Sequence, residues 1–213
     1  MKLQTASVRR AFLAAMAVFG LSATIVSAKG IDFDFKDPKG VNTIAFVLDS
    51  MFEPFMGLAT GITGTVTFDP AKPEDMKGKI VVDAKSLQFG HSGMTGPLQG
   101  EDWLNVKKNP DISFELKKVE KVEKKPDNSM EMQVAGEFTC KGVTKPMTLP
   151  VKLNFHKGKA GERMKNAKGD LLVLRSTFII KRSVFGIHPE GGKEIVADDI
   201  EVRVSIVGSG LEK

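Results

Sequence analysis

The 213-residue chain is poor in cysteine and in hydroxylated aromatic residues. Its single cysteine, Cys140, excludes an intrachain disulfide framework and a zinc site made of four thiolates. It has one Trp and no Tyr, so its aromatic content rests almost wholly on 14 Phe. With 41% hydrophobic and 27% charged residues, the composition fits neither a disordered chain nor a multi-span membrane protein. The length fits one domain, or at most two small ones.

The sequence also lacks an apolar run long enough to cross a membrane comfortably. Its longest run, residues 11–26, is shorter than the roughly 20 residues that a bilayer requires. A basic stretch precedes this run and small residues at 26–28 end it, as in a secretory signal peptide. We therefore expect residues 1–28 to be a signal peptide cleaved near Ala28. Residues 29–213 are then one periplasmic or secreted domain with no stable membrane span.

A large excess of basic charge, which a nucleic-acid partner would require, is absent from that domain. Of the 31 basic residues, Lys2, Arg9 and Arg10 belong to the expected signal peptide, which leaves 28 against 26 acidic residues. This balance provides no strong basic stripe, so we expect no nucleic-acid partner. The Arg9-Arg10 pair leaves twin-arginine export open beside the general route.

What the domain has in abundance is period-two alternation of apolar and polar residues. The clearest alternating runs are 112–117, 130–138, 147–156 and 200–206, and further strands are expected near 31–36, 41–48, 62–69, 78–87 and 170–181. Successive side chains of a strand point to opposite faces, so each run buries one face, as antiparallel sheets do. Only residues 49–59 and 96–107 resist this pattern, and we expect short helices or structured loops there.

The length of these strands favours a closed barrel. Runs 111–122 and 145–156 would each extend roughly 40 Å at about 3.3 Å per residue. Long strands that follow one another in hairpins suit an up-and-down barrel better than a Greek-key sandwich. The predicted fold class is therefore all-β, an antiparallel up-and-down β-barrel with one or two short helices.

Four segments of the domain carry motifs that occur together in one known family. They are Gly64–Pro70 (GTVTFDP), Asn109–Phe114 (NPDISF), Gly136–Leu149 (GEFTCKGVTKPMTL) and Lys181–Ile187 (KRSVFGI). In this order they resemble the G-x-I-x-F-D strand, the P-x-I-x-F strand start, the G-x-L-T-x-x-G-V-T-K-P-V-x-L segment and the N-R-x-x-F-G-I turn of the YceI-like family of secreted bacterial lipid-binding proteins. The resemblance covers roughly residues 32–207.

This resemblance implies a lipocalin-like barrel in the periplasm, with an apolar lumen that holds a polyisoprenoid chain, and often a homodimer. The implied partner is a long-chain apolar lipid of the polyisoprenoid or isoprenoid quinone class. The chain departs from the family in two polar elements. Asn42 and Thr43 stand where the family has His-Ser, and Gly100–Leu104 (GEDWL) stands where it has R-D-x-H-L, so that Arg and His are absent.

A lumen of this kind needs side chains that bring apolar volume without a polar group. Phe and Met do so, and the chain has 14 Phe and 10 Met. The residues expected to face inward and bind the ligand are Ile44, Phe46, Val66, Phe68, Ile80, Val82, Ile112, Phe114, Phe138, Leu149, Val151, Phe178 and Val204. The alternative is that they fill a solid core, since an eight-stranded barrel can pack itself full or hold one slim ligand. The protein would then be a ligand-free secreted interaction or stress-associated module.

A hydrolase is the least favoured function. Gly90–Met94 (GHSGM) nearly matches the G-x-S-x-G nucleophile elbow around Ser92, but Met94 replaces the last glycine. The elbow also requires a strand-to-helix turn in an α/β sheet, which the alternating pattern does not offer. We expect a flexible glycine-rich loop there, with segments 49–62 and 88–106 at or near an entrance to the barrel. No catalytic residue and no enzyme activity are expected.

Metal and cofactor binding are not expected either. His91, His156 and His188 lie far apart in the sequence, without the short spacing of metal-ligand pairs. Cys140 is expected to be a small buried apolar residue rather than a reactive thiol.

Overall fold

The structure, a computed structural model, describes residues 30–52, 54–188 and 195–212. The expected signal peptide at 1–28 lies outside these residues. Within the described ranges, no helix combines the length and the apolar character that crossing a membrane requires.

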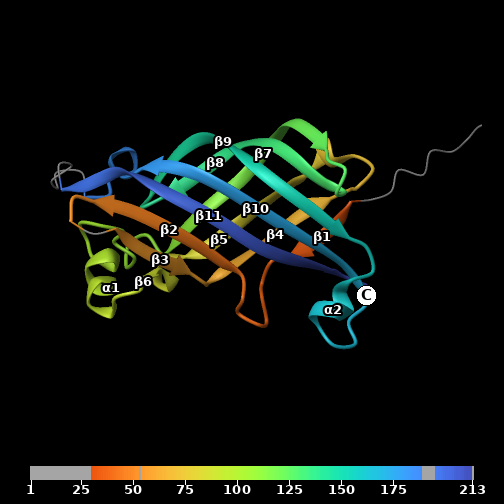
Figure 1. Cartoon of the computed structure of the whole chain (residues 1–213), viewed down its shortest axis with the longest axis horizontal. Helices are drawn as coiled ribbons and strands as arrows, with labels where there is room; N and C mark the ends of the chain where they lie inside the picture. Colours follow the sequence, from red (N-terminus) through yellow and green to blue (C-terminus); the bar gives the residue numbers. More distant parts are fainter. Residues whose placement is uncertain (1–29, 53, 189–194, 213) are drawn as a thin grey trace, which may run out of the picture.

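Antiparallel strands dominate this part of the chain, with two short α-helices at opposite ends of the molecule (Figure 1). The strands are β1 (Ile31–Asp34), β2 (Thr43–Ser50), β3 (Phe55–Ala59), β4 (Ile62–Phe68), β5 (Lys77–Asp83), β6 (Gln88–Phe89), β7 (Asp111–Lys124), β8 (Ser129–Cys140), β9 (Val143–His156), β10 (Gly169–Lys181) and β11 (Val196–Leu211). The helices are α1 (Ser92–Gln99) and α2 (Ala160–Arg163), and 3₁₀ turns span Pro73–Asp75, Ala84–Ser86 and Arg182–Phe185.

The strands form one sheet that closes on itself. Its order is β1-β4-β5-β7-β8-β9-β10-β11-β2-β3-β6, and β1 also pairs with β11. β1 and β2 therefore act as one interrupted strand along β11, and β3 with β4 and β5 with β6 act in the same way. Counted in this way, the barrel has eight strands, each antiparallel to the next along the chain. The predicted up-and-down barrel is confirmed.

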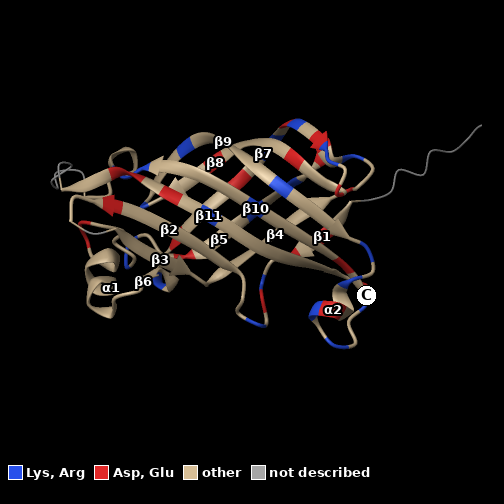
Figure 2. Ribbon diagram, in the orientation of Figure 1, with Lys and Arg blue, Asp and Glu red and all other residues tan. Residues whose placement is uncertain are grey.

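Every expected strand is present, with one face turned inward. In β8 the even-numbered residues from Met130 to Cys140 are all buried, while Glu131, Gln133 and Glu137 are exposed. Lys, Arg, Asp and Glu positions are interspersed over the strands and loops of the barrel in Figure 2. This distribution follows from strand geometry, because a polar side chain on the outer face keeps its contact with water.

Two β-bulges adjust the inward face of β7. The pairing of β7 with β8 shifts register between Leu116 and Lys118 and again between Val119 and Lys121. Each bulge inserts one extra residue into the strand. As a result Leu116, Val119 and Val122 all pack against the core at a spacing of three, which simple alternation does not allow.

The prediction of a short helix or structured loop at 49–59 is wrong for both ends of this segment. The first residues of this segment end β2 and its last five form β3, which pairs with β2. The alternation of apolar and polar residues is hard to recognise in β3. The inward residue Gly57 has no apolar side chain, and the apolar residue Leu58 is exposed. A Cβ atom on Gly57 would lie 2.2 Å from Cζ of Phe46, whose ring occupies the space inside the barrel.

The glycine-rich segment 90–94 is not a flexible loop throughout, because α1 begins at its third residue. This helix contains two glycines and Pro97, so residue preference does not explain it. Tertiary contacts do: Leu98 is buried, and the Gln99 side chain donates to two backbone carbonyl oxygens of residues 85 and 87, at 2.9 and 3.1 Å.

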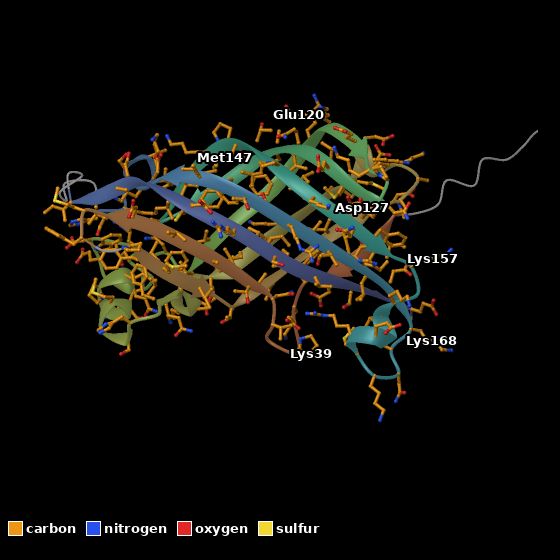
Figure 3. All side chains as sticks on the ribbon, viewed as in Figure 1. Lys39, Glu120, Asp127, Met147, Lys157 and Lys168 are labelled. Atoms are coloured by element: carbon orange, nitrogen blue, oxygen red, sulfur yellow. The ribbon has the colours of Figure 1, made fainter. Side chains whose placement is uncertain are left out.

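The end of the barrel next to α2 is filled by phenylalanine side chains. Phe33 and Phe68 are fully buried there, and the Phe155 ring packs on both, with centroids 6.2 and 6.0 Å away. Lys157 and Lys168 mark this end in Figure 3, on either side of the loop that carries α2. Packing of large rings therefore closes this end of the tube.

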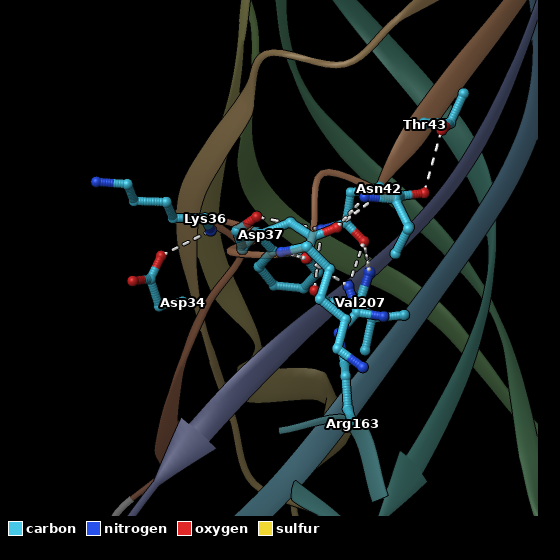
Figure 4. A network of polar contacts seen from close by, with 10 residues as sticks. Asp34, Lys36, Asp37, Asn42, Thr43, Arg163 and Val207 are labelled. Atoms are coloured by element: carbon cyan, nitrogen blue, oxygen red, sulfur yellow. Dashed lines mark hydrogen bonds and ion pairs between the residues drawn. The ribbon is translucent and has the colours of Figure 1, made fainter. Parts of the chain in front are cut away.

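Between β1 and β2 the chain leaves the sheet, and the side chain of Asn42 replaces the missing ladder bonds (Figure 4). Its amide nitrogen donates to the carbonyl oxygens of Phe35 and Val207, and its oxygen accepts from the Val207 amide at 2.9 Å. Arg163 of α2 donates to the same oxygen and pairs with Asp37 at 2.9 Å. Asn42, which is 2% exposed, thus links β11, α2 and the segment between β1 and β2 in one hydrogen-bond network.

Asp37 is the acid of this network. Burial alone would raise the pKa of its carboxyl group, but hydrogen bonds from the amides of residues 42, 39 and 41 lower it, as does the guanidinium of Arg163. The net pKa lies below its ordinary value of 3.8, so the carboxylate stays charged until strongly acidic pH.

We predict that Asn42→Ala lowers the free energy of unfolding by about 2–3 kcal/mol, because buried backbone groups of Phe35 and Val207 lose their partner. Chemical denaturation followed by circular dichroism measures the change. Thr43→Ala is the matched control: the Thr43 hydroxyl bonds to the Val41 carbonyl at an exposed position, so its removal should cost no more than about 0.5 kcal/mol. Equal effects of the two substitutions would contradict the bridging role of Asn42.

We also predict that acid destabilises the wild type more than Asp37→Asn. A carboxylate whose pKa is lowered by folding stabilises the fold above its unfolded-state pKa, and this contribution is lost as pH falls through the folded-state pKa. The stability difference between the two proteins should therefore be constant above about pH 5 and shrink below about pH 4. Urea unfolding across this range measures it, and a pH-independent difference would be inconsistent with the lowered pKa.

Candidate functional site

An apolar cavity of about 190 Å³ lies inside the barrel, on the α1 side of the phenylalanine packing. Strands from β2 to β11 contribute to its wall, and nearly all of the wall side chains are aliphatic or phenylalanine. One water molecule needs about 10–15 Å³ on this scale, so the cavity has room for on the order of 15 methylene-sized groups. Such a wall offers apolar contact and almost no hydrogen-bonding group, which suits a hydrocarbon chain.

The structure places nearly all of the residues expected in the lumen on this wall. They are Ile44, Phe46, Val66, Ile80, Val82, Ile112, Phe114, Phe138, Leu149, Val151, Phe178 and Val204. Phe68 is also inside the barrel, but it belongs to the packed end and does not border the cavity. Alternation identifies the inner face, whereas position along the tube decides which inward residue meets free space.

Sequence reasoning missed the wall residues that come from outside the alternating strands. Leu98, Trp103 and Leu104 line the cavity from the segment between β6 and β7, and Ile187 lines it from the segment between β10 and β11. Segment 88–106, which was expected at an entrance, thus covers the end of the cavity next to α1. The one signal for this role is the Trp103-Leu104 pair, two large apolar residues in a polar stretch.

Hydrogen bonds between three loops hold this cover in place. The ammonium group of Lys141, at the β8–β9 turn, donates to the carbonyl oxygens of Asp102 (2.8 Å) and Gly186 (2.6 Å). The Asp102 carbonyl also accepts the amide of His188 at 2.8 Å. The His188 ring stacks on Trp103, with centroids 5.3 Å apart and planes 10° apart. Trp103 is therefore fixed between His188 and the cavity.

Arg182 anchors the segment that follows β10. Its guanidinium is buried and donates to the carbonyl oxygens of Ile187, His188, Val196 and Ala197. Backbone carbonyls thus satisfy this buried cation, as burial requires. Arg182 thus fixes the segment after β10, which helps to cover the cavity, and does not itself line the cavity.

Among the residues that the structure describes, no group of three His, Cys, Asp or Glu side chains could hold a metal ion. Cys140 is on the cavity wall, and burial raises the pKa of its thiol to about 12, so the thiol stays protonated at neutral pH. Ser92 is exposed at the start of α1 and does not border the cavity. The cavity offers shape and apolar contact to a ligand.

Known proteins share both the sequence pattern and the fold. The YceI-like domain matches residues 37–208 of the chain. A UPF0312 protein of Pseudomonas aeruginosa (strain LESB58) is 31% identical over 190 residues, which are 88% of this chain and 92% of that protein. A UPF0312 protein of Yersinia pestis (strain Pestoides F) is 37% identical over 90 residues, 42% of this chain and 44% of that protein.

Solved structures of similar fold include the YCEI protein of Campylobacter jejuni, with a TM-score of 0.58, 26% identity and coverage of 74% of this chain and 84% of that one. BcnA of Burkholderia cenocepacia gives 0.63 at 23% identity, covering 78% and 95%. A polyisoprenoid binding domain from Saccharophagus degradans gives 0.61 at 9% identity, covering 85% and 99%. The last two show a likeness of fold alone. Since the domain pattern spans most of the chain and a relative 31% identical covers 88% of it, the chain belongs to the YceI-like domain family.

Proposed function

We propose that the mature protein binds one long apolar lipid chain, of the polyisoprenoid or isoprenoid quinone class, inside its barrel and without catalysis. The observation that carries the proposal is the apolar cavity beside a solidly packed barrel end. A structural neighbour that is a polyisoprenoid binding domain supports it. Free space inside the barrel argues against the alternative of a ligand-free module with a filled lumen.

Removal of an apolar chain from water supplies the binding free energy. Each buried CH₂ contributes about 0.8 kcal/mol, so ten of them give roughly 8 kcal/mol before the entropy cost of association. Room for on the order of 15 methylene-sized groups corresponds to about three isoprene units. A longer chain must therefore extend beyond the cavity or widen it.

We further propose that the protein works in the periplasm or is secreted, and that it forms a homodimer. The signal-peptide pattern of residues 1–28 supports the location, and the family resemblance supports both statements. The near balance of charge in residues 29–213 speaks against a nucleic-acid partner.

The only Trp of the chain lines the cavity, so it can report on an occupant. We predict that farnesol, a short isoprenoid alcohol, changes the fluorescence of Trp103 saturably after the protein has been delipidated on a hydrophobic resin. Native mass spectrometry of the protein before delipidation should reveal a bound long-chain lipid. Free N-acetyltryptophanamide is the optical control. Absence of both the fluorescence change and the lipid would refute the proposal.

A cavity-filling substitution tests the assigned wall. Val82 faces the cavity from β5, whereas Val81 on the same strand faces outward. We predict that Val82→Phe weakens farnesol binding about tenfold or more, because the ring displaces about two methylene groups, roughly 1.6 kcal/mol of contact. Val81→Phe is the matched control and should leave affinity unchanged. Equal affinities of the two folded variants would show that the ligand does not occupy this cavity.

A further inference from the structure

The barrel wall has a weak seam between β9 and β10. The two strands pair only over residues 152–156 of β9 and 171–175 of β10. Each strand pairs with its other neighbour along nearly its whole length. Toward α1, residues 143–151 and 176–181 of these fully described strands run on without pairing to each other. The backbone hydrogen-bond ladder between β9 and β10 is therefore missing toward α1.

Two prolines explain the position of the seam. Lys141 and Gly142 form the two-residue β8–β9 turn, both with positive φ (48° and 75°), as in a type I′ hairpin. The residues that flank such a turn bond to each other, so odd-numbered residues of β9 bond to β8 and even-numbered ones face β10. Pro146 and Pro150 are even-numbered, and a proline has no N–H to donate. β9 therefore offers β10 two positions without a donor.

The side chain of Ser176 bridges the beginning of the seam. Its hydroxyl donates to the carbonyl oxygen of Pro150 at 2.5 Å, next to the last strand pair. This geometry confirms that the Pro150 carbonyl faces β10. A single hydroxyl can turn away without unpairing two strands, so the bridge yields more easily than a ladder does.

The seam separates the cavity from a groove on the outside of the barrel. This groove has a volume of about 380 Å³ and runs over β7, β8, β9 and β10. Val151, Arg175 and Ser176 border both the groove and the cavity. Arg175 belongs to the last strand pair, and Val151 and Ser176 follow directly beyond it, so the cavity and the groove adjoin where the ladder ends.

Both ends of the barrel are covered within the described part of the chain. Phenylalanine packing fills the α2 end. At the α1 end Leu98, Leu104 and Ile187 are buried, and Lys141 ties their loops together. A ligand that reaches the cavity through the seam need not displace either cover.

The charges of the groove favour an anion at the seam. Lys152 and Arg175 face each other in the last strand pair, and like charges in this position repel. Lys152 pairs with Asp127 at 3.1 Å, whereas no carboxylate of the described residues pairs with Arg175 or Lys121. The two acidic residues of the groove, Glu123 and Glu131, each form an ion pair with Lys125. Among the described residues, Arg175 is therefore a cation without a carboxylate partner beside the opening.

We propose that the lipid reaches the cavity through the β9–β10 seam and that the outer groove seats its head group, a compact anion of the phosphate class, beside Arg175. The tail crosses the wall between Val151 and Ser176. This inference rests on the proposed lipid binding and adds the place and chemistry of the head group.

Two probes with the same tail test the head-group site. Farnesyl phosphate and farnesol are each titrated against the delipidated protein, with Trp103 fluorescence as the readout. Arg175→Gln should weaken farnesyl phosphate about fivefold and change farnesol less than about twofold, since only the phosphate bonds to the guanidinium. Lys77→Gln, on the outer face of β5, is the charge-matched control and should change neither.

Uptake kinetics test the passage. Pro146→Val/Pro150→Val supplies two N–H donors that face β10, so stopped-flow uptake of farnesol should slow at least about tenfold. Ser176→Ala removes the bridge and should speed uptake, which keeps the test valid if the double variant does not fold. Thr148→Val lies between the two prolines, adds no backbone donor and serves as the control.

The outcomes separate the two proposals. Unchanged uptake in the folded double variant and in Ser176→Ala would overturn the passage. Equal effects of Arg175→Gln on both probes, or none on either, would overturn the head-group site. If neither probe changes Trp103 fluorescence in the wild type, the proposed lipid binding itself fails.

Discussion

Closure of the backbone hydrogen-bond ladder is the constraint on which the rest of this molecule depends. A sheet that returns to its first strand turns alternate side chains of every strand into one shared interior. Where the chain leaves the sheet between β1 and β2, the buried side chain of Asn42 supplies the missing bonds, and Arg163 ties that point to α2. The wall therefore holds its shape without a solid core along its whole length.

The interior of the barrel has a packed part and a vacant part. Near α2, Phe155 packs against the buried rings of Phe33 and Phe68, and none of the three borders the cavity. Near α1, aliphatic residues, five phenylalanines and Trp103 surround free space that lacks contacts that a filled core would have. An internal void lowers stability in proportion to its size. A hydrocarbon chain that enters it regains those contacts, so the vacancy favours binding.

The sequence predicts the barrel well because alternation is a local signal, and it predicts the ends of the cavity poorly because they depend on distant contacts. The alternation of apolar and polar residues in β8 is clear from Met130 to Cys140. In β3 it is not clear, because the inward residue Gly57 must be small to admit the Phe46 ring. Helix α1 forms through burial and side-chain bonds to distant backbone, against its residue preferences. Trp103 reaches the wall only because loops far apart in sequence meet at Lys141.

The same rule of ladder closure explains why access and stability do not conflict in this fold. Opening a paired seam between two strands would break several backbone bonds in an apolar wall, each with a net contribution of about 0.5–1.5 kcal/mol and a larger cost if its groups stay unpaired. Along β9, prolines 146 and 150 lack two of the donors that would face β10, and this stretch is already unpaired, so it has no ladder to lose. Ser176 satisfies the first free carbonyl with a bond that rotation can release. On the route that we propose, a tube closed by hydrogen bonds admits a chain at a place where two prolines withhold backbone donors.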